Sequence, residues 1–133
     1  MLAIAGLLAA VVIPSLPGAL ESARLKGTAG EMRAVLTLAR TLAVSEAKSR
    51  TVVFDFARGE YGFDADERKW LLPEGIRLAA VRLGDADKES GVVRMRFYPD
   101  GSADETEVAL SSSGGGRIRV SVDPLTGIVG EGT

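Results

Sequence analysis

The chain has 133 residues, 46% of them hydrophobic and 26% charged, which is enough to bury the core of one folded domain. It has no cysteine and no histidine, which excludes disulfides, thiolate and imidazole metal sites, and the serine–histidine–aspartate triad. The formal charge of -2 disfavours a generally basic nucleic-acid-binding protein. These exclusions point away from an enzyme, and we expect no catalytic residue, no cofactor and no metal.

Charge is distributed unevenly along the chain. Residues 1–20 carry no charged side chain, residues 21–50 carry six basic and three acidic ones, and residues 51–133 carry ten basic and fifteen acidic ones. An apolar start is therefore followed by a basic segment of net charge +3 and an acidic remainder of net charge -5.

The first residues form a continuous apolar run, Met1–Ile13, which Pro14 and Pro17 then interrupt. A membrane-spanning helix needs roughly 20 apolar residues. A signal peptide would have basic residues before the run, and a buried helix would have a polar face. We interpret residues 1–17 as the end of a membrane or filament-core helix, truncated at its N-terminus and kinked at Pro14, with a damaged signal peptide as the alternative. The side chains expected in this apolar core are Leu2, Ile4, Leu7, Leu8, Val11, Val12 and Ile13.

A second pattern begins after Gly18, where apolar residues recur at steps of three and four with charged residues between them. This period predicts an amphipathic helix over residues 18–50 with one apolar stripe, which we expect to lie against a β-sheet. The stripe consists of Leu25, Met32, Val35, Leu36, Ala39, Leu42 and Ala43.

Beyond residue 50 the helical period gives way to short alternating runs with turn residues between them, which predicts antiparallel β structure over residues 51–133. Pro99–Ser102 is expected to be a hairpin turn, and Leu83–Gly91 a loop. The fold class is therefore α+β, a long N-terminal helix packed on an antiparallel sheet, with residues 18–133 as one domain. The expected strands are 51–56, 61–63, 76–81, 92–98, 105–110, 117–122 and 128–129.

Four segments resemble known families. Leu2–Leu16 is similar to the later part of the hydrophobic helix of type IV pilins and type II secretion pseudopilins. The turns Phe97–Ser102 and Val122–Gly127, together with Leu72–Ile76, resemble the GspH/FimT family of minor pseudopilins and minor pilins. Members of that family begin with a basic leader, a processing glycine, an N-methylated phenylalanine and a glutamate. None of these is in the sequence, so the processing site and the assembly glutamate have no residue number here.

The resemblance implies a minor pseudopilin of the type II secretion system. Such a subunit spans the bacterial inner membrane once, keeps its C-terminal domain in the periplasm, and joins other pseudopilins in a filament that helps export folded exoproteins. Exoproteins are therefore further candidate partners. Two alternatives are a minor type IV pilin of FimT/FimU type, acting in pilus assembly or DNA uptake, and a secreted small β-domain binding module.

The segment Gly116–Arg119 matches a Gly-Arg-x-Arg string through which certain FimT-like pilins bind DNA. Arg117 and Arg119 lie two residues apart on an expected strand, so they face the same side, and Arg94 and Arg96 would extend them into a basic stripe. We favour a solvated strand face instead, because this part of the chain has a net charge of -5, and we expect no nucleic-acid partner. The carboxylates expected to pair with these arginines include Asp104, Glu105 and Glu107.

Other candidate sites have simpler interpretations. Trp70, the only tryptophan, is expected in the core beside Phe54, Phe56 or Phe63. The acidic segment Asp64–Glu67 lacks the ligand series of a calcium loop and is interpreted as a polar hairpin turn. A glycosidase-like pair among Glu60, Asp64 and Glu74 is disfavoured, because nothing singles out two of these carboxylates.

Overall fold

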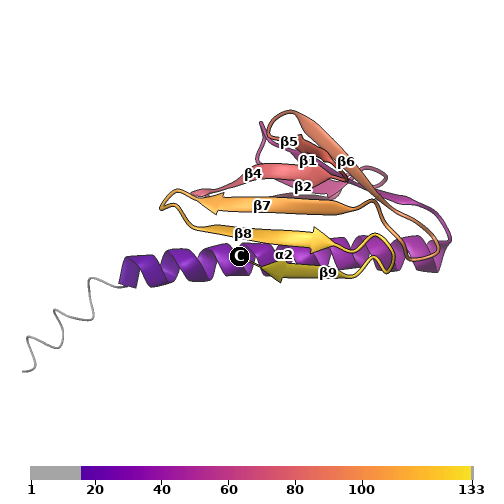
Figure 1. The fold of residues 1–133 in the computed structure, drawn as a ribbon, viewed down its shortest axis with the longest axis horizontal. Coiled ribbons are helices and arrows are strands. Elements are labelled where there is room, and N and C mark those ends of the chain that lie inside the picture. The colour runs from indigo at the N-terminus through magenta and orange to yellow at the C-terminus, as the bar shows by residue number, and fades with distance from the viewer. Residues whose placement is uncertain (1–15, 133) are drawn as a thin grey trace, which may run out of the picture.

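The computed structural model describes residues 16–132, which form one helix followed by nine strands (Figure 1). The helix α2 spans Leu16–Glu46. The strands are β1 Arg50–Asp55, β2 Glu60–Phe63, β3 Lys69–Leu71, β4 Ile76–Leu83, β5 Ala86–Lys88, β6 Val92–Phe97, β7 Thr106–Ser112, β8 Arg117–Val122 and β9 Val129–Gly132. The predicted α+β class is confirmed.

The strands form two antiparallel sheets. A four-stranded sheet has the order β3-β2-β1-β6, and a five-stranded sheet has the order β5-β4-β7-β8-β9. Strands of both sheets contact α2, and β7, β8 and β9 lie lengthwise along it (Figure 1). One face of the five-stranded sheet is therefore covered by the helix, and the other is open.

The apolar stripe of α2 packs against the sheets as predicted. Met32, Leu36 and Ala39 are fully buried, and Leu42 is half-buried at the edge of the same core. The stripe also includes Ala29 and the buried Thr28, whose hydroxyl donates a hydrogen bond to the Arg24 carbonyl oxygen at 2.9 Å. The facing aromatic residues of the core are Phe54, Tyr61, Phe63 and Phe97.

The helix ends at Glu46, short of the predicted residue 50. Ala47 adopts a left-handed φ of 54°, the Lys48 N–H donates to the Ala43 carbonyl at 3.2 Å, and the Ala47 N–H points to the Val44 carbonyl at 3.4 Å. This is the Schellman arrangement, in which a left-handed residue closes the helix, and that residue is usually glycine. Because alanine stands in the glycine position, the sequence carries no stop signal there.

The predicted turn at Pro99–Ser102 is confirmed, but it does not make β6 and β7 neighbours in one sheet. The chain does turn, since the Gly101 N–H donates to the Tyr98 carbonyl at 3.0 Å, and Phe97 pairs with Ala103 in a single bridge. Asp104 then caps the edge of β6, because its carboxylate accepts the Arg96 N–H and its own N–H donates to the Arg96 carbonyl, both at 3.0 Å. The chain leaves for the other sheet, where β7 lies between β4 and β8.

The segment Leu83–Gly91, predicted to be a loop, contains the short strand β5. Gly84, with a φ of 57°, turns the chain back so that Leu83 pairs with Ala86 and Val81 with Lys88. The five-stranded sheet thus ends in a small exposed hairpin. The charged composition of the segment gives no signal for a strand, which is why a loop was predicted.

Trp70 is half-buried on the edge strand β3 and packs against the core. Its ring meets Phe63 edge-on at a centroid distance of 5.2 Å and stacks on Tyr61 at 6.1 Å. The predicted contact with Phe63 is confirmed, and Tyr61 takes the place expected for Phe54 or Phe56.

Candidate functional site

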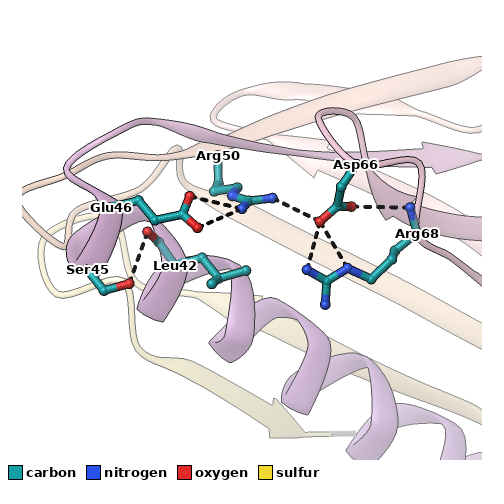
Figure 2. A network of polar contacts seen from close by, with 6 residues as sticks. All are labelled: Leu42, Ser45, Glu46, Arg50, Asp66 and Arg68. Atoms are coloured by element: carbon teal, nitrogen blue, oxygen red, sulfur yellow. Dashed lines mark hydrogen bonds and ion pairs between the residues drawn. The ribbon is translucent and has the colours of Figure 1, made fainter.

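A buried arginine connects the end of α2 to the four-stranded sheet (Figure 2). Arg50 is 9% exposed, and its guanidinium bonds the Glu46 carboxylate at 3.0 Å and the Asp66 carboxylate at 3.3 Å. It also lies 5.6 Å from the centroid of the Phe63 ring, within range of a cation–π contact. Arg50 therefore ties the end of the helix to the sheet, and no sequence pattern predicts this because an arginine after a helix is usually solvated.

Asp66 is held by two arginines and belongs to the β2–β3 turn. Arg68 bonds its carboxylate at 2.7 Å, and this hydrogen bond is the main reason why the pKa of Asp66 lies below its ordinary value. The polar turn predicted at Asp64–Glu67 is therefore confirmed. Within residues 16–132 no cluster of carboxylates is suited to holding a metal ion.

The two turns that carried the family resemblance meet at one helix residue, Arg40. Its Nε donates to the carbonyl oxygens of Gly101, at 3.2 Å, and Thr126, at 2.8 Å. The turns also bond each other directly, since the Ala103 N–H donates to the Pro124 carbonyl at 3.0 Å. Gly127 has a φ of 68°, and a Cβ there would collide with the Gly101 carbonyl oxygen, so glycine is required.

The open face of the five-stranded sheet has opposite charges at its two ends. At the end near Arg40, a shallow hollow of about 570 Å³ is lined by one arginine, Arg82, and four carboxylates. At the other end, a hollow of about 440 Å³ contains Arg77, Arg117 and one carboxylate, Glu89. The four carboxylates of the first hollow are Asp85, Glu105, Glu107 and Asp123.

The proposed basic stripe is divided between the two sheets. Arg117 and Arg119 both project from the open face of β8, as the two-residue spacing predicts. Arg94 and Arg96 lie on β6, in the four-stranded sheet. Arg119 is paired with Glu107 at 3.2 Å, which leaves Arg117 as the one cation of the pair without a carboxylate partner among the described residues.

The apolar segment predicted to enter the membrane lies outside the described residues. This applies to Leu2, Ile4, Leu7, Leu8, Val11, Val12, Ile13 and the expected kink at Pro14. Within residues 16–132, no helix combines the length and the apolar character that a membrane crossing requires.

The fold defines a class of protein: a long N-terminal helix packed lengthwise on antiparallel sheets is the architecture of a pilin-like subunit. Residues 28–126 match the family model described as type II transport protein GspH, and the chain belongs to that family. The match runs from the buried stripe of α2 to the second of the two turns at Arg40. No curated protein matches the chain.

Solved structures with the same fold come from two bacteria. The minor pseudopilin EpsH of the Vibrio cholerae type II secretion system is similar in two structures. Both are 16% identical in sequence to this chain. One has a TM-score of 0.66 and covers 84% of this chain and 94% of its own. The other has a TM-score of 0.63 and covers 83% of this chain and 97% of its own. The type IV minor pilin FimU of Pseudomonas aeruginosa is 17% identical, with a TM-score of 0.60 over 85% of this chain and 91% of that chain.

Proposed function

We propose that this chain is a minor pseudopilin of the type II secretion system, a structural subunit of the periplasmic pseudopilus that helps export folded exoproteins. The observation that carries the proposal is the matched segment itself. In this GspH-family chain, one helix packs on both sheets through a buried stripe, and the sequence before it is apolar and uncharged. Such a helix connects a filament core to an outer body.

In this proposal the chain has two parts. Residues 1–17 form the segment that lies first in the inner membrane and then in the filament core, with Pro14 as its kink. Residues 18–133 form the periplasmic domain. The uncharged sequence ends at Leu20, and the first charged residue, Glu21, already contacts the folded domain through the Gly114 N–H.

The subunit would work by shape and contact and not by chemistry. Its partners are the other major and minor pseudopilins, and exported proteins could touch the completed filament. The polar connections at Arg40 and Arg50 hold the body rigidly on the helix, as a subunit that transmits movement between filament and cargo requires.

A minor type IV pilin of FimU type is the second candidate, favoured by a TM-score to FimU close to the scores for EpsH. The two functions differ in what is lost when the gene is deleted. A pseudopilin mutant retains its exoproteins in the periplasm and keeps its surface pili. A minor pilin mutant loses surface pili and secretes normally.

The deciding experiment is therefore a deletion strain in which both phenotypes are measured, complemented by the complete gene or by a version lacking residues 1–17. We expect the complete gene to restore exoproteins to the culture medium, and the shortened version to fail because it cannot enter the membrane. Normal secretion with lost pili would contradict the proposal in favour of a minor pilin. Recovery of the native protein in the medium instead of the membrane fraction would favour the secreted binding module.

A further inference from the structure

The β7–β8 hairpin reaches back to the N-terminal end of α2. The Gly114 N–H donates to the Glu21 carboxylate, and a Cβ on Gly116 would lie 3.2 Å from a methyl carbon of Leu25. Figure 1 shows the tip of this hairpin at the end of the molecule where the described helix begins. Glu21 is five residues from Leu16, a distance of about 8 Å along a helix at 1.5 Å per residue.

Basic side chains gather at this end. Arg77, Ser111 and Arg117 stand opposite one another across β4, β7 and β8, and the Arg77 Nε donates to the Ser111 hydroxyl at 3.3 Å. Lys26 of α2 lines a second small hollow together with Arg117. The exposed Arg24 lies on the same turn of the helix.

These cations are held in no ion pair within the described part of the chain. None of Arg24, Lys26, Arg77 and Arg117 forms an ion pair there, whereas Arg119, one step further along β8, is paired with Glu107. Three carboxylates lie at the same end, and one of them is engaged by the Gly114 N–H. They are Glu21, Glu89, which lines the hollow with Arg77 and Arg117, and Glu74, which precedes the Gly75 whose carbonyl accepts the Ser113 N–H.

We propose that this end of the body, comprising the β7–β8 tip at residues 113–116 and the cations Arg24, Lys26, Arg77 and Arg117, rests on the anionic headgroups of the membrane. The inference rests on the proposed placement of residues 1–17 in the bilayer. The headgroup layer is about 5–8 Å thick on each side, so a tip about 8 Å from Leu16 lies within its reach. The acidic hollow at the opposite end would be repelled by the same surface, so the contact also sets the orientation of the body before assembly.

The test uses the full chain in vesicles, with a reporter at each end. Because the chain has no cysteine, Ser113→Cys and Leu125→Cys each give a single labelling site, the first at the proposed contact and the second on the exposed turn beside Arg40. Vesicles of phosphatidylcholine alone are compared with equal parts of phosphatidylcholine and phosphatidylglycerol. Flotation with the vesicles reports anchoring, and quenching of the label by a lipid that carries the quencher on its headgroup reports contact with the bilayer surface.

We expect the chain to float with both vesicle types, and the label at residue 113 alone to be quenched, more strongly with phosphatidylglycerol and less at high salt. Arg77→Gln with Arg117→Gln should weaken tip contact about fivefold for each arginine, without changing flotation. The matched control is Arg94→Gln with Arg96→Gln, which removes the same charge from the other sheet. Flotation without lipid-dependent quenching at residue 113, or quenching at residue 125 instead, would overturn the inference and leave the anchor intact. Failure to float would overturn the placement of residues 1–17, and the inference with it.

Discussion

The Arg40 side chain connects α2 to the two turns that carry the family resemblance. A guanidinium that donates to two backbone carbonyls fixes both turns relative to the helix, and its removal leaves the Gly101 and Thr126 oxygens without that donor. Arg33 lies on the same helix, but its side chain is 48% exposed and its only ion pair among the described residues is with Glu131 at 4.0 Å.

We therefore expect Arg40→Ala to lower the free energy of unfolding by about 1.5–3 kcal/mol, the usual range for hydrogen bonds to a charged group. Arg33→Ala should cost less than about 1 kcal/mol, as exposed ion pairs do. Thermal unfolding followed by circular dichroism measures both. Equal effects of the two substitutions would show that the bonds of Arg40 do not stabilise the turns.

Asp66 makes the stability of the fold depend on pH. The Arg68 hydrogen bond holds the pKa of Asp66 below its ordinary value of 3.8, so the folded state binds a proton less readily than the unfolded state. The resulting stability is present at neutral pH and is lost as the pH falls through the folded-state pKa.

Asp66→Asn should therefore lower the thermal midpoint at about pH 7, and this difference should shrink as the pH falls through the lowered folded-state pKa of Asp66, where the native carboxylate becomes protonated too. Asp64→Asn, in the same turn but without an ion pair in the described residues, is the control and should have little effect at neutral or acid pH. A midpoint difference for Asp66→Asn that does not shrink in acid would contradict the assignment.

At the scale of secondary structure, the buried stripe of α2 is what joins helix to sheets. Leu36 is fully buried, and a carboxylate there would lack any cation partner in the core, so Leu36→Asp should cost several kcal/mol. The adjacent Thr37 is exposed, and Thr37→Asp introduces the same charge without burying it. A thermal midpoint unchanged by Leu36→Asp would refute the packing, whereas Thr37→Asp should change it little.

The end of the same helix offers a stabilising change. Ala47 has a left-handed φ of 54°, which costs an alanine roughly 1 kcal/mol and a glycine nothing, so Ala47→Gly should raise the thermal midpoint. Ala34→Gly, on the exposed middle of α2, should lower stability by about 1 kcal/mol. Opposite signs for the same substitution are the expected outcome, and a loss of stability at both positions would mean that Ala47 is not strained.

The successes and failures of sequence-based prediction at this scale have physical causes. The stripe of α2 and the alternation of β6 and β8 are local periodicities, and they were predicted correctly. The partner of β7 is a non-local choice, and a good turn at Pro99–Ser102 does not determine it. Arg40 and Arg50 were missed for the same reason, because their partners are distant in sequence or lie beyond a turn.

Over the whole molecule, the distribution of arginines and carboxylates argues against a role in DNA uptake. We expect no micromolar DNA binding by the full chain in detergent, because residues 51–133 have a net charge of -5, Arg119 is already paired with Glu107, and the arginines of β6 lie on the other sheet. Fluorescence anisotropy with duplex DNA at low salt measures this. Micromolar binding that Arg117→Gln with Arg119→Gln abolishes, while the fold stays intact, would instead assign the chain to DNA uptake.

The lengthwise packing of α2 against β7, β8 and β9 has a mechanical consequence. Polar contacts hold the body to the helix at three places: at Glu21 through the β7–β8 hairpin, at Arg40 through the two turns, and at Glu46 through Arg50. The first and the last are about 38 Å apart along the helix. A force along the helix axis therefore loads this whole contact in shear, so that the buried stripe and all of these polar contacts resist the force together. A pull perpendicular to the axis would instead open the contact from one end, one turn at a time. The contact should therefore resist a load along the helix axis better than a load across it.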